Sequence, residues 1–367
     1  MSAEHEDEGA RARRWSRTNL LIMQAAARLG AKAEPLSQAR TDFFLRLRGE
    51  GRSVIISKTR SPFLTQVAQT LSNNKKVSRE LLAAIGLPVP PDLLLDEGDD
   101  PRGAAAQGFL RRFGAVVVKP NWGNRGVGVT PGIREMEGLA RAISRAQAID
   151  RDEEALLEPH LEGTNVRLTV IGGRCVAAAE IVRPLLRGDG VTSAAAAIAA
   201  LNEDPRRGSW AAPALVAMDV IEAEEAMAAH LEALGLDLEE PLPAGASIEI
   251  TSEEAEVIDR SDAIDRAWFE VAEAACARLG VDVGGVDLRG PLASFVRAPR
   301  GGAEAWREAA ILEVNALPAL HYHALPTVGA PRPVFEAFVA YCLSLPGAPG
   351  PCAAIGAADD QRAVNSG

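Results

Sequence analysis

Two short apolar segments in the C-terminal third of the chain constrain its fold most strongly. Residues 285–288 read GVDL, and residues 310–314 open the run AILEVNALP. Successive side chains of a β-strand point to opposite faces. Leu312, Val314 and Ala316 therefore predict one apolar face, and the positions between them carry polar groups. We expect the two segments to form neighbouring strands.

The polar face of this strand pair carries groups that suit a metal ion. Glu313 and Asn315 share one side of their strand, and Asp287 lies near the C-terminal end of the other. Carboxylate and amide oxygens are the hard ligands that Mg²⁺ prefers, usually completed by phosphates and water. The alternative is a solvated strand face. The residue types favour the metal site, because neither lysine nor threonine occupies these positions.

A glycine-rich segment follows the predicted strand 115–119. In KPNWGNRGVGVT, Gly123, Gly126 and Gly128 allow backbone N–H groups to approach phosphate oxygens without interference from a Cβ atom. The spacing matches neither the P-loop nor the dinucleotide-binding fingerprint, so an ordinary tight turn explains it as well. Lys119, at the end of the strand, favours phosphate binding because it adds a positive charge there.

Bulk composition excludes several classes of protein. The chain has 367 residues and a net charge of −11, which argues against general nucleic-acid binding. No apolar run approaches the roughly 18 residues that cross a membrane. The four cysteines form no metal-binding or disulfide pattern, and the charged N-terminus does not resemble a signal peptide. We expect a cytoplasmic protein without nucleic-acid or membrane partners.

The pattern along the chain predicts an α/β (α+β) fold with disordered ends. Residues 1–16 and 346–367 are expected to be disordered tails, because the first mixes charges and the second is rich in Gly, Pro and Ala. A small α/β unit is expected over 17–72. The main domain is expected over 73–345, with a central subdomain at about 112–160.

Seven segments in order carry a family resemblance. They are SNNKKVSRELLAAIGLPVP, VVVKPNWGNRGVGV, LLEPHLEGTNVRLTVIGG, RGDG, LNEDPRRG, GVDL and ILEVNALP. Together they resemble the ATP-grasp superfamily, most closely the ATP-grasp region of cyanophycin synthetase and of bifunctional glutathione synthetases. The resemblance covers about 72–345, with a weaker similarity of the preceding residues to a small pre-ATP-grasp unit. It implies two α+β subdomains that grip ATP.

The resemblance implies roles on the nucleotide side. Lys75 and Lys119 match two lysines that contact phosphates. Glu158 matches the acid that binds the adenine amino group, and Leu161 matches a residue whose backbone bonds the ring. Asn165 stands where the family usually has an acid for the ribose hydroxyls, and its amide can still form hydrogen bonds there.

The resemblance also implies a metal site and residues near the transferred phosphate. Asp287, Glu313 and Asn315 match the metal ligands, with Glu313 between two Mg²⁺ ions; Mn²⁺ is an alternative metal. Arg167 matches an arginine near the phosphate. The flap over the phosphates is matched by Gly123, Asn124, Gly126 and Gly128. The motif LNEDPRRG contributes Arg206 and Arg207, and we assign these two arginines to catalysis.

For the residues that could bind substrate, the sequence leaves two roles open. Arg183 and Arg187 suit a bidentate carboxylate clamp, but surface ion pairs explain them equally well. His321 and His323, in ALHYHALP, suit a base or a substrate contact, or structural hydrogen bonds within the loop. The segment 247–265 and an insertion at 290–310 depart from the family, so we expect a substrate different from those of its relatives.

The function that follows is an ADP-forming carboxylate–amine ligase that uses ATP and Mg²⁺ on amino acids or small peptides, through an acyl phosphate. A maturase that forms amide or ester bonds in a ribosomal peptide is a second hypothesis, and a non-catalytic ATP-binding scaffold is a third. No second ligase domain of the Mur type is expected. The family resemblance also suggests a homo-oligomer.

Overall fold

The computed structural model describes residues 15–36, 43–123, 126–208, 215–222, 227–228, 231–232, 234–250 and 253–345. Both expected tails therefore lie almost wholly outside the described residues. The sequence pattern also predicts a helix over 222–235, and half of these residues lie outside as well. Within the described residues, no helix combines the length and the apolar character needed to span a membrane.

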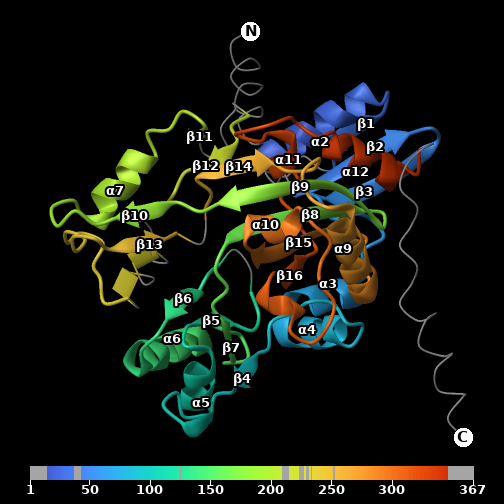
Figure 1. Ribbon diagram of the computed structural model, residues 1–367. Helices are drawn as coiled ribbons and strands as arrows, with labels where there is room; N and C mark the ends of the chain where they lie inside the picture. Colours follow the sequence, from blue (N-terminus) through green and yellow to red (C-terminus); the bar gives the residue numbers. More distant parts are fainter. Residues whose placement is uncertain are drawn as a thin grey trace, which may run out of the picture.

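A five-stranded antiparallel sheet forms the centre of the fold (Figure 1). One of its faces packs on the helices α3, α4 and α9, and the other packs at one end on α2 and α12. The strands in spatial order are β14 (Glu256–Asp259), β9 (Arg174–Val182), β8 (Thr164–Ile171), β15 (Val283–Gly290) and β16 (Ala310–Asn315). The helices are α2 (Arg17–Arg28), α3 (Gln66–Asn73), α4 (Lys75–Ala83), α9 (Arg266–Leu279) and α12 (Val334–Leu343).

A four-stranded antiparallel sheet forms a separate subdomain, at the bottom of Figure 1. Its apolar side chains pack on two helices in a core of their own. The strands in order are β4 (Leu93–Leu95), β7 (Ala155–Pro159), β5 (Val116–Pro120) and β6 (Thr130–Ile133), and the helices are α5 (Ala104–Phe113) and α6 (Met136–Ile149). The strand β4 precedes residue 112, where the sequence suggested that this subdomain begins, and α5 starts before that residue.

The N-terminal unit is not an independent domain, because it shares its core with the end of the chain. Its antiparallel sheet contains β1 (Lys32–Pro35), β2 (Phe44–Gly49) and β3 (Arg52–Ser57). Leu45 and Leu47 of β2 are fully buried in one cluster with side chains of α12. Ser16, one residue before the expected boundary at residue 17, caps α2 by accepting a hydrogen bond from the Asn19 N–H.

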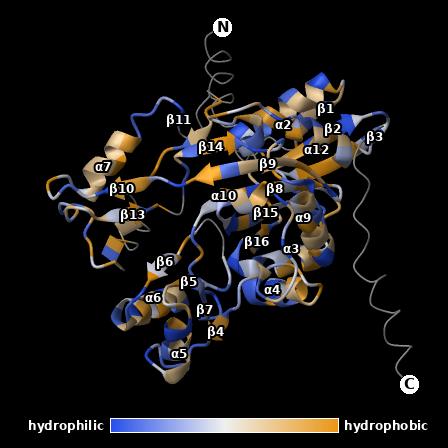
Figure 2. Ribbon diagram, viewed as in Figure 1, coloured by the Kyte–Doolittle hydropathy of each residue, from blue (hydrophilic) through white to orange (hydrophobic). Residues whose placement is uncertain are grey.

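Two smaller parts complete the described chain. An apolar cluster joins α7 (Ala194–Leu201) to β10 (Leu185–Arg187) and β13 (Ser247–Glu249), and α7 is apolar along its whole length (Figure 2). The 290–310 insertion folds onto α9, where the Trp268 indole donates to the carbonyls of Ser294 and Arg297 at 3.1 and 3.0 Å. Phe295 and Trp306 of the insertion are buried, whereas most residues between them are exposed. The shortest elements are β11 (Arg207–Gly208), β12 (Met218–Asp219), α10 (Leu292–Phe295), η1 (Ala305–Arg307) and α11 (His321–Ala324).

Candidate active site

The three predicted metal ligands meet on one face of the five-stranded sheet. Asp287 of β15 lies opposite Glu313 of β16 and opposite Arg167 of β8. Arg167 donates from Nε and Nη2 to the two oxygens of Asp287, at 2.6 and 2.5 Å. The Asn315 amide nitrogen lies 2.8 Å from Asp287 and 2.9 Å from Glu313. The sequence-based grouping of these residues is therefore present in the structure.

A β-bulge changes the strand pattern next to this site. The register shifts between Asp287 and Leu288, so Leu288 lies opposite Ile311 and Leu312 has no partner. Ile311 and Val314 both enter the main core, whereas Leu312 lines the cavity. The prediction that Leu312 shares the buried face with Val314 was wrong, because a bulge inserts one residue into the alternation.

This donor set fits a hard divalent cation. Lys75 and Lys119 lower the pKa of Glu313 below its usual range, although burial alone would raise it, so this carboxylate stays ionised. Half a turn of the Asn315 amide would present its oxygen where its nitrogen now lies. Within the described residues no cluster of three or more His, Cys, Asp and Glu suits a metal ion. Two carboxylates and an amide instead match Mg²⁺, which normally completes its coordination with phosphates and water.

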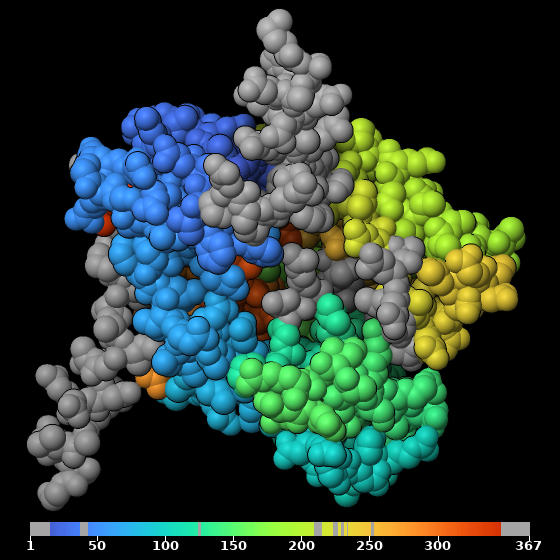
Figure 3. All heavy atoms as spheres, turned by 180° about the vertical axis from the view of Figure 1, so that it is seen from behind, coloured from blue at the N-terminus to red at the C-terminus, as the bar shows by residue number. Residues whose placement is uncertain are grey.

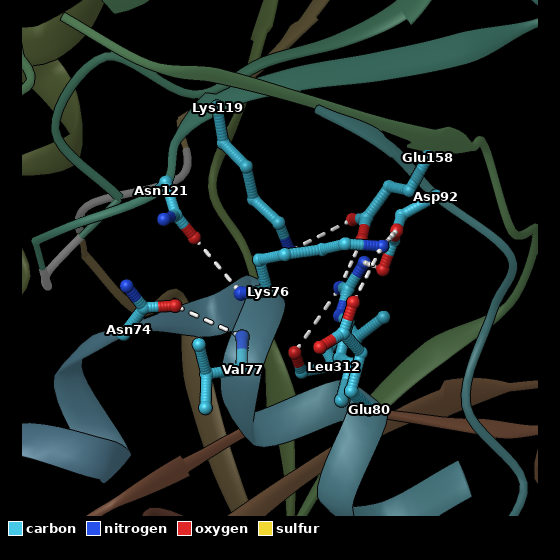
Figure 4. Close-up of polar contacts among 10 residues, drawn as sticks. Asn74, Lys76, Val77, Glu80, Asp92, Lys119, Asn121, Glu158 and Leu312 are labelled. Atoms are coloured by element: carbon cyan, nitrogen blue, oxygen red, sulfur yellow. Dashed lines mark hydrogen bonds and ion pairs between the residues drawn. The ribbon is translucent and has the colours of Figure 1, made fainter. Parts of the chain in front are cut away.

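A buried ionic cluster lies where the two subdomains meet (Figure 4). Lys119 donates to both oxygens of Glu158, at 3.0 and 2.9 Å, and Arg79 of α4 also pairs with Glu158. Arg79 further donates to the Leu312 carbonyl at 3.2 Å, which links α4 to β16. These side chains are almost fully buried, so the two cations stabilise a carboxylate that burial alone would destabilise.

The charges of the cluster determine the protonation of its members. Burial would raise the pKa of Glu158, but Arg79 and Lys119 lower it to about 2. Burial and the neighbouring Arg79 lower the pKa of Lys119 to about 8. The Arg79 guanidinium keeps its proton at any ordinary pH, so Lys119 is the cation of the cluster that can lose its charge by deprotonation.

Arg79 is a site residue that the sequence analysis missed. It lies four residues after Lys75 on α4, and positions i and i+4 occupy the same face of a helix. That spacing was a usable signal, because it places a second cation beside a predicted phosphate ligand. Arg289 of β15 was missed as well; it donates to the Leu161 carbonyl at 2.7 Å and to the Asn165 amide oxygen at 3.0 Å.

Lys75 joins the start of α4 to the glycine-rich loop. Its ammonium donates to the Gly123 carbonyl at 2.9 Å. Gly123, Gly126 and Gly128 all adopt positive φ, and a Cβ at Gly128 would lie 2.7 Å from the Pro120 side chain. Glycine is thus required by the backbone at this loop, as a tight turn or a phosphate-binding loop would need. The predicted flap residue Asn124 lies outside the described residues.

The residues suggested for substrate separate into two groups. Arg183 and His321 line the cavity, and His321 Nε2 lies 2.8 Å from Arg17 Nη2. His323 is buried behind the cavity, with Nε2 2.7 Å from the Thr169 hydroxyl. Burial lowers the pKa of His323 to about 3, so its imidazole is neutral.

The other three arginines predicted for substrate or catalysis do not line the cavity. Arg187 lies on β10, and Arg206 forms an ion pair with Asp204 at 2.6 Å. Arg207 is buried and donates to the Asp219 carbonyl at 2.9 Å and to a carbonyl of residue 254. The catalytic role of Arg206 and Arg207 remains a sequence-based prediction, and their contacts here hold neighbouring segments together.

All remaining predicted residues except Gly128 line one cavity of about 420 Å³. Figure 3 shows the molecular surface hollowed between the blue N-terminal segments and the green four-stranded subdomain, with the orange C-terminal segments visible in its depth. The five-stranded sheet supplies Asp287 and Glu313, the four-stranded sheet supplies Lys119 and Glu158, and the N-terminal unit supplies Arg17. The cavity is therefore built by three parts of the fold.

Known proteins share this architecture. A bifunctional glutathione synthetase structure from Pasteurella multocida superimposes with a TM-score of 0.57 over 90% of this chain and 44% of that chain, at 22% identity. The chain has the ATP-grasp fold. The predicted fold class is confirmed. The two α+β subdomains face each other, and the cavity lies between them.

Sequence comparison relates this chain to proteins of two kinds. It is 28% identical over 272 residues to cyanophycin synthetase of Synechocystis, covering 72% of this chain and 29% of that protein. It is 26% identical over 320 residues to a bifunctional glutathione biosynthesis protein of Mannheimia succiniciproducens. That match covers 85% of this chain and 40% of the relative. The chain thus spans less than half of these relatives. No family model matches it.

The depressed pKa of Lys119 predicts proton uptake when a phosphate-bearing ligand binds in the cavity, and MgATP is the ligand that the family resemblance implies. Phosphate oxygens stabilise the charged lysine, so binding raises a pKa that is about 8 in the free protein. Near pH 9 we expect uptake of about one proton, near pH 7 almost none, and an affinity that falls as pH rises above about 8. Calorimetric titrations in two buffers of different ionisation enthalpy measure this. Lys119→Arg should show no uptake at either pH; equal uptake in both proteins would assign it elsewhere.

Proposed function

We propose that the protein is an ATP- and Mg²⁺-dependent carboxylate–amine ligase that forms an amide bond through an acyl phosphate and releases ADP. The observation that carries the proposal is the convergence of Lys75, Lys119, Asp287, Glu313 and Asn315 on one cavity. Cations for phosphates and hard ligands for a metal are the two requirements of phosphoryl transfer. The similarity to cyanophycin and glutathione ligases supports the same chemistry.

Each part of the cavity has a task in this proposal. Lys75 and Lys119 hold phosphate oxygens, and Asp287, Glu313 and Asn315 hold Mg²⁺, which neutralises charge on the transferred phosphoryl group. Arg167 extends from β8 to the proposed metal ligands, where its bidentate contact with Asp287 positions it. A carboxylate is a poor electrophile, so its phosphorylation prepares it for attack by an amine. The enclosure by two subdomains excludes water from the acyl phosphate.

The cavity also carries charged groups that suit amino acid or peptide substrates. Arg17, Arg183, Asp219 and Glu254 line it, so cationic and anionic groups are both present. Tyr322 donates its hydroxyl to Glu254, and Arg167 lies 5.3 Å from the Tyr322 ring centre. A zwitterionic substrate finds complementary charges in such a site, whereas a purely apolar one does not.

The experiment that tests the proposal is a screen of amino acids and dipeptides in pairs, with MgATP, for ADP release and for a new amide by mass. We expect ADP and phosphate only when donor and amine are both present, and no release when EDTA removes the metal. Formation of AMP and pyrophosphate with a productive pair would refute the acyl-phosphate route. Absence of product with every pair would refute a ligase for amino acids and dipeptides.

A further inference from the structure

The turn between β3 and α3 enters the cavity beside the proposed metal site. Thr59 at its centre is buried and donates from its hydroxyl to the Pro318 carbonyl at 2.8 Å. Pro318 lies three residues after Asn315, so this bond ties the turn to the loop that leaves the metal ligands. Lys58 and Arg60 flank Thr59 and both line the cavity. The turn therefore contributes two basic residues to the cavity lining.

Arg60 differs from the other arginines that line the cavity. Arg17, Arg167, Arg183 and Arg289 each lie within 4 Å of a carboxylate, at distances of 3.0, 2.5, 3.7 and 3.5 Å. Arg60 donates from Nε to the Gln69 amide oxygen at 2.7 Å, and no carboxylate of the described residues pairs with it. Its pKa is lowered by burial alone, with no acidic neighbour to oppose the shift. A partly buried guanidinium without a counter-charge is costly, so the site favours an anionic ligand.

A second, smaller pocket of about 230 Å³ adjoins the cavity at the same residue. Arg60 and Gln69 line both pockets and so form the boundary between them. Apart from Arg60, the side chains that line the second pocket are uncharged. They are Phe44, Ile55, Ile56, Ser57, Ser61, Leu64, Thr65, Gln66 and Gln69.

We propose that Arg60 binds the α-carboxylate of the amine substrate, an α-amino acid whose uncharged side chain enters the second pocket. This assignment rests on the proposed ligase function. An α-amino acid has three substituents on one carbon, and the structure offers a place for each. The carboxylate lies at Arg60, the side chain lies in the second pocket, and the amine points along the cavity toward the metal ligands. Gln69 is a positioning residue, because it holds the guanidinium through Nε and leaves the other nitrogens for the carboxylate.

Arg60→Gln tests the carboxylate contact. A hydrogen bond to a charged group contributes about 1.5–3 kcal/mol, so we expect the KM of the amine substrate to rise about 10- to 100-fold. The KM of ATP should change little, because the Arg60 side chain bonds to Gln69 and to none of the predicted nucleotide residues. Arg60→Lys should recover part of the loss, since it keeps the charge without the planar fork. The matched control is Arg52→Gln, an exposed arginine of β3 that lines neither pocket.

Substrate analogues separate a carboxylate contact from a general loss of structure. With leucine as the amine substrate, leucinamide should be about as poor for the wild-type protein as leucine is for Arg60→Gln. Leucinamide should then suffer little additional loss in the variant, because the contact is already absent. If the loss from replacing leucine by leucinamide and the loss from Arg60→Gln multiply when combined, the two changes act independently, and the proposed contact is overturned.

Ile55→Asp tests the second pocket. Ile55 is 44% exposed, so a carboxylate there is tolerated by the fold, but it places a charge in the pocket wall. We expect the KM of leucine to rise, while glycine, which has no side chain to place, is little affected. Val67→Asp, at a 64% exposed position that lines neither pocket, is the control.

The outcomes distinguish this assignment from the proposed function. ADP release by the wild-type protein with an unchanged amine KM in Arg60→Gln overturns the assignment and leaves the ligase intact. A wild-type preference for aspartate or lysine as the amine substrate overturns the second pocket as the side-chain site. No ADP release with any pair overturns the ligase and the assignment together.

Discussion

Glu313→Gln is expected to lower the rate of ADP release by about 10²- to 10³-fold. The substitution keeps the shape of the side chain and removes the charge that a divalent ion requires, and loss of one transition-state contact typically costs about 10²–10³ in rate. The loss should appear in kcat at saturating ATP. The Mg²⁺ concentration for half-maximal rate should also rise, because two charged ligands become one.

The fold should survive this substitution, because Asn315 can still bond to the new amide. Removal of the Glu313 charge should lower the pKa of Lys119 further, since Glu313 is one of the groups that raise it. Thermal unfolding and circular dichroism test whether the fold is intact. Glu308→Gln is the matched control: Glu308 pairs with Arg297 at 2.9 Å, outside the cavity. Normal turnover by Glu313→Gln would remove Glu313 from the metal site and refute this part of the proposal.

The local features of the site could be predicted from sequence, because they depend on strand alternation. Alternation placed Glu313 beside Asn315, and the β15–β16 pairing then brought both to Asp287. The bulge at Leu312 could not be predicted, because it depends on how β16 pairs with β15. The unusual 290–310 segment had no sequence-based explanation either, since its packing on Trp268 is a contact between distant parts of the chain.

The missed residues share a physical reason. Arg79 and Arg60 are ordinary surface-type residues in sequence, and each acquires its role from a partner on another element. Arg79 meets Glu158 across 79 residues of chain, and Thr59 beside Arg60 meets Pro318 across 259. Sequence patterns within one element indicate which face a side chain takes, but not which distant group meets it. The core of the N-terminal unit is another example, because α12, from the other end of the chain, completes it.

Arg79→Met is expected to destabilise the protein by about 3 kcal/mol at pH 7, because removing one partner of a buried ionic group leaves the remaining charge less compensated. Methionine fills a similar volume, so the loss reflects charge and hydrogen bonds more than a cavity. Lys119 still pairs with Glu158, which keeps the expected loss at the lower end of the range for such pairs. Urea unfolding at pH 7 measures the free energy of unfolding. In a double-mutant cycle, Glu158→Gln with Arg79→Met should cost less than the sum of the two single substitutions.

The stability loss caused by Arg79→Met should depend on pH in a defined direction. The pKa of Glu158 is about 2 in the folded protein, below its ordinary value of 4.5, so its contribution to stability is complete above about pH 4.5 and is lost as pH falls toward 2. Arg79→Met raises that folded pKa, so less stability remains to be lost in acid. The difference in free energy of unfolding between wild type and variant should therefore be largest at pH 7 and narrow between pH 4.5 and pH 3. A difference that stays constant over this range would mean that Arg79 acts through packing alone, because only an interaction with the Glu158 charge disappears when that carboxyl is protonated.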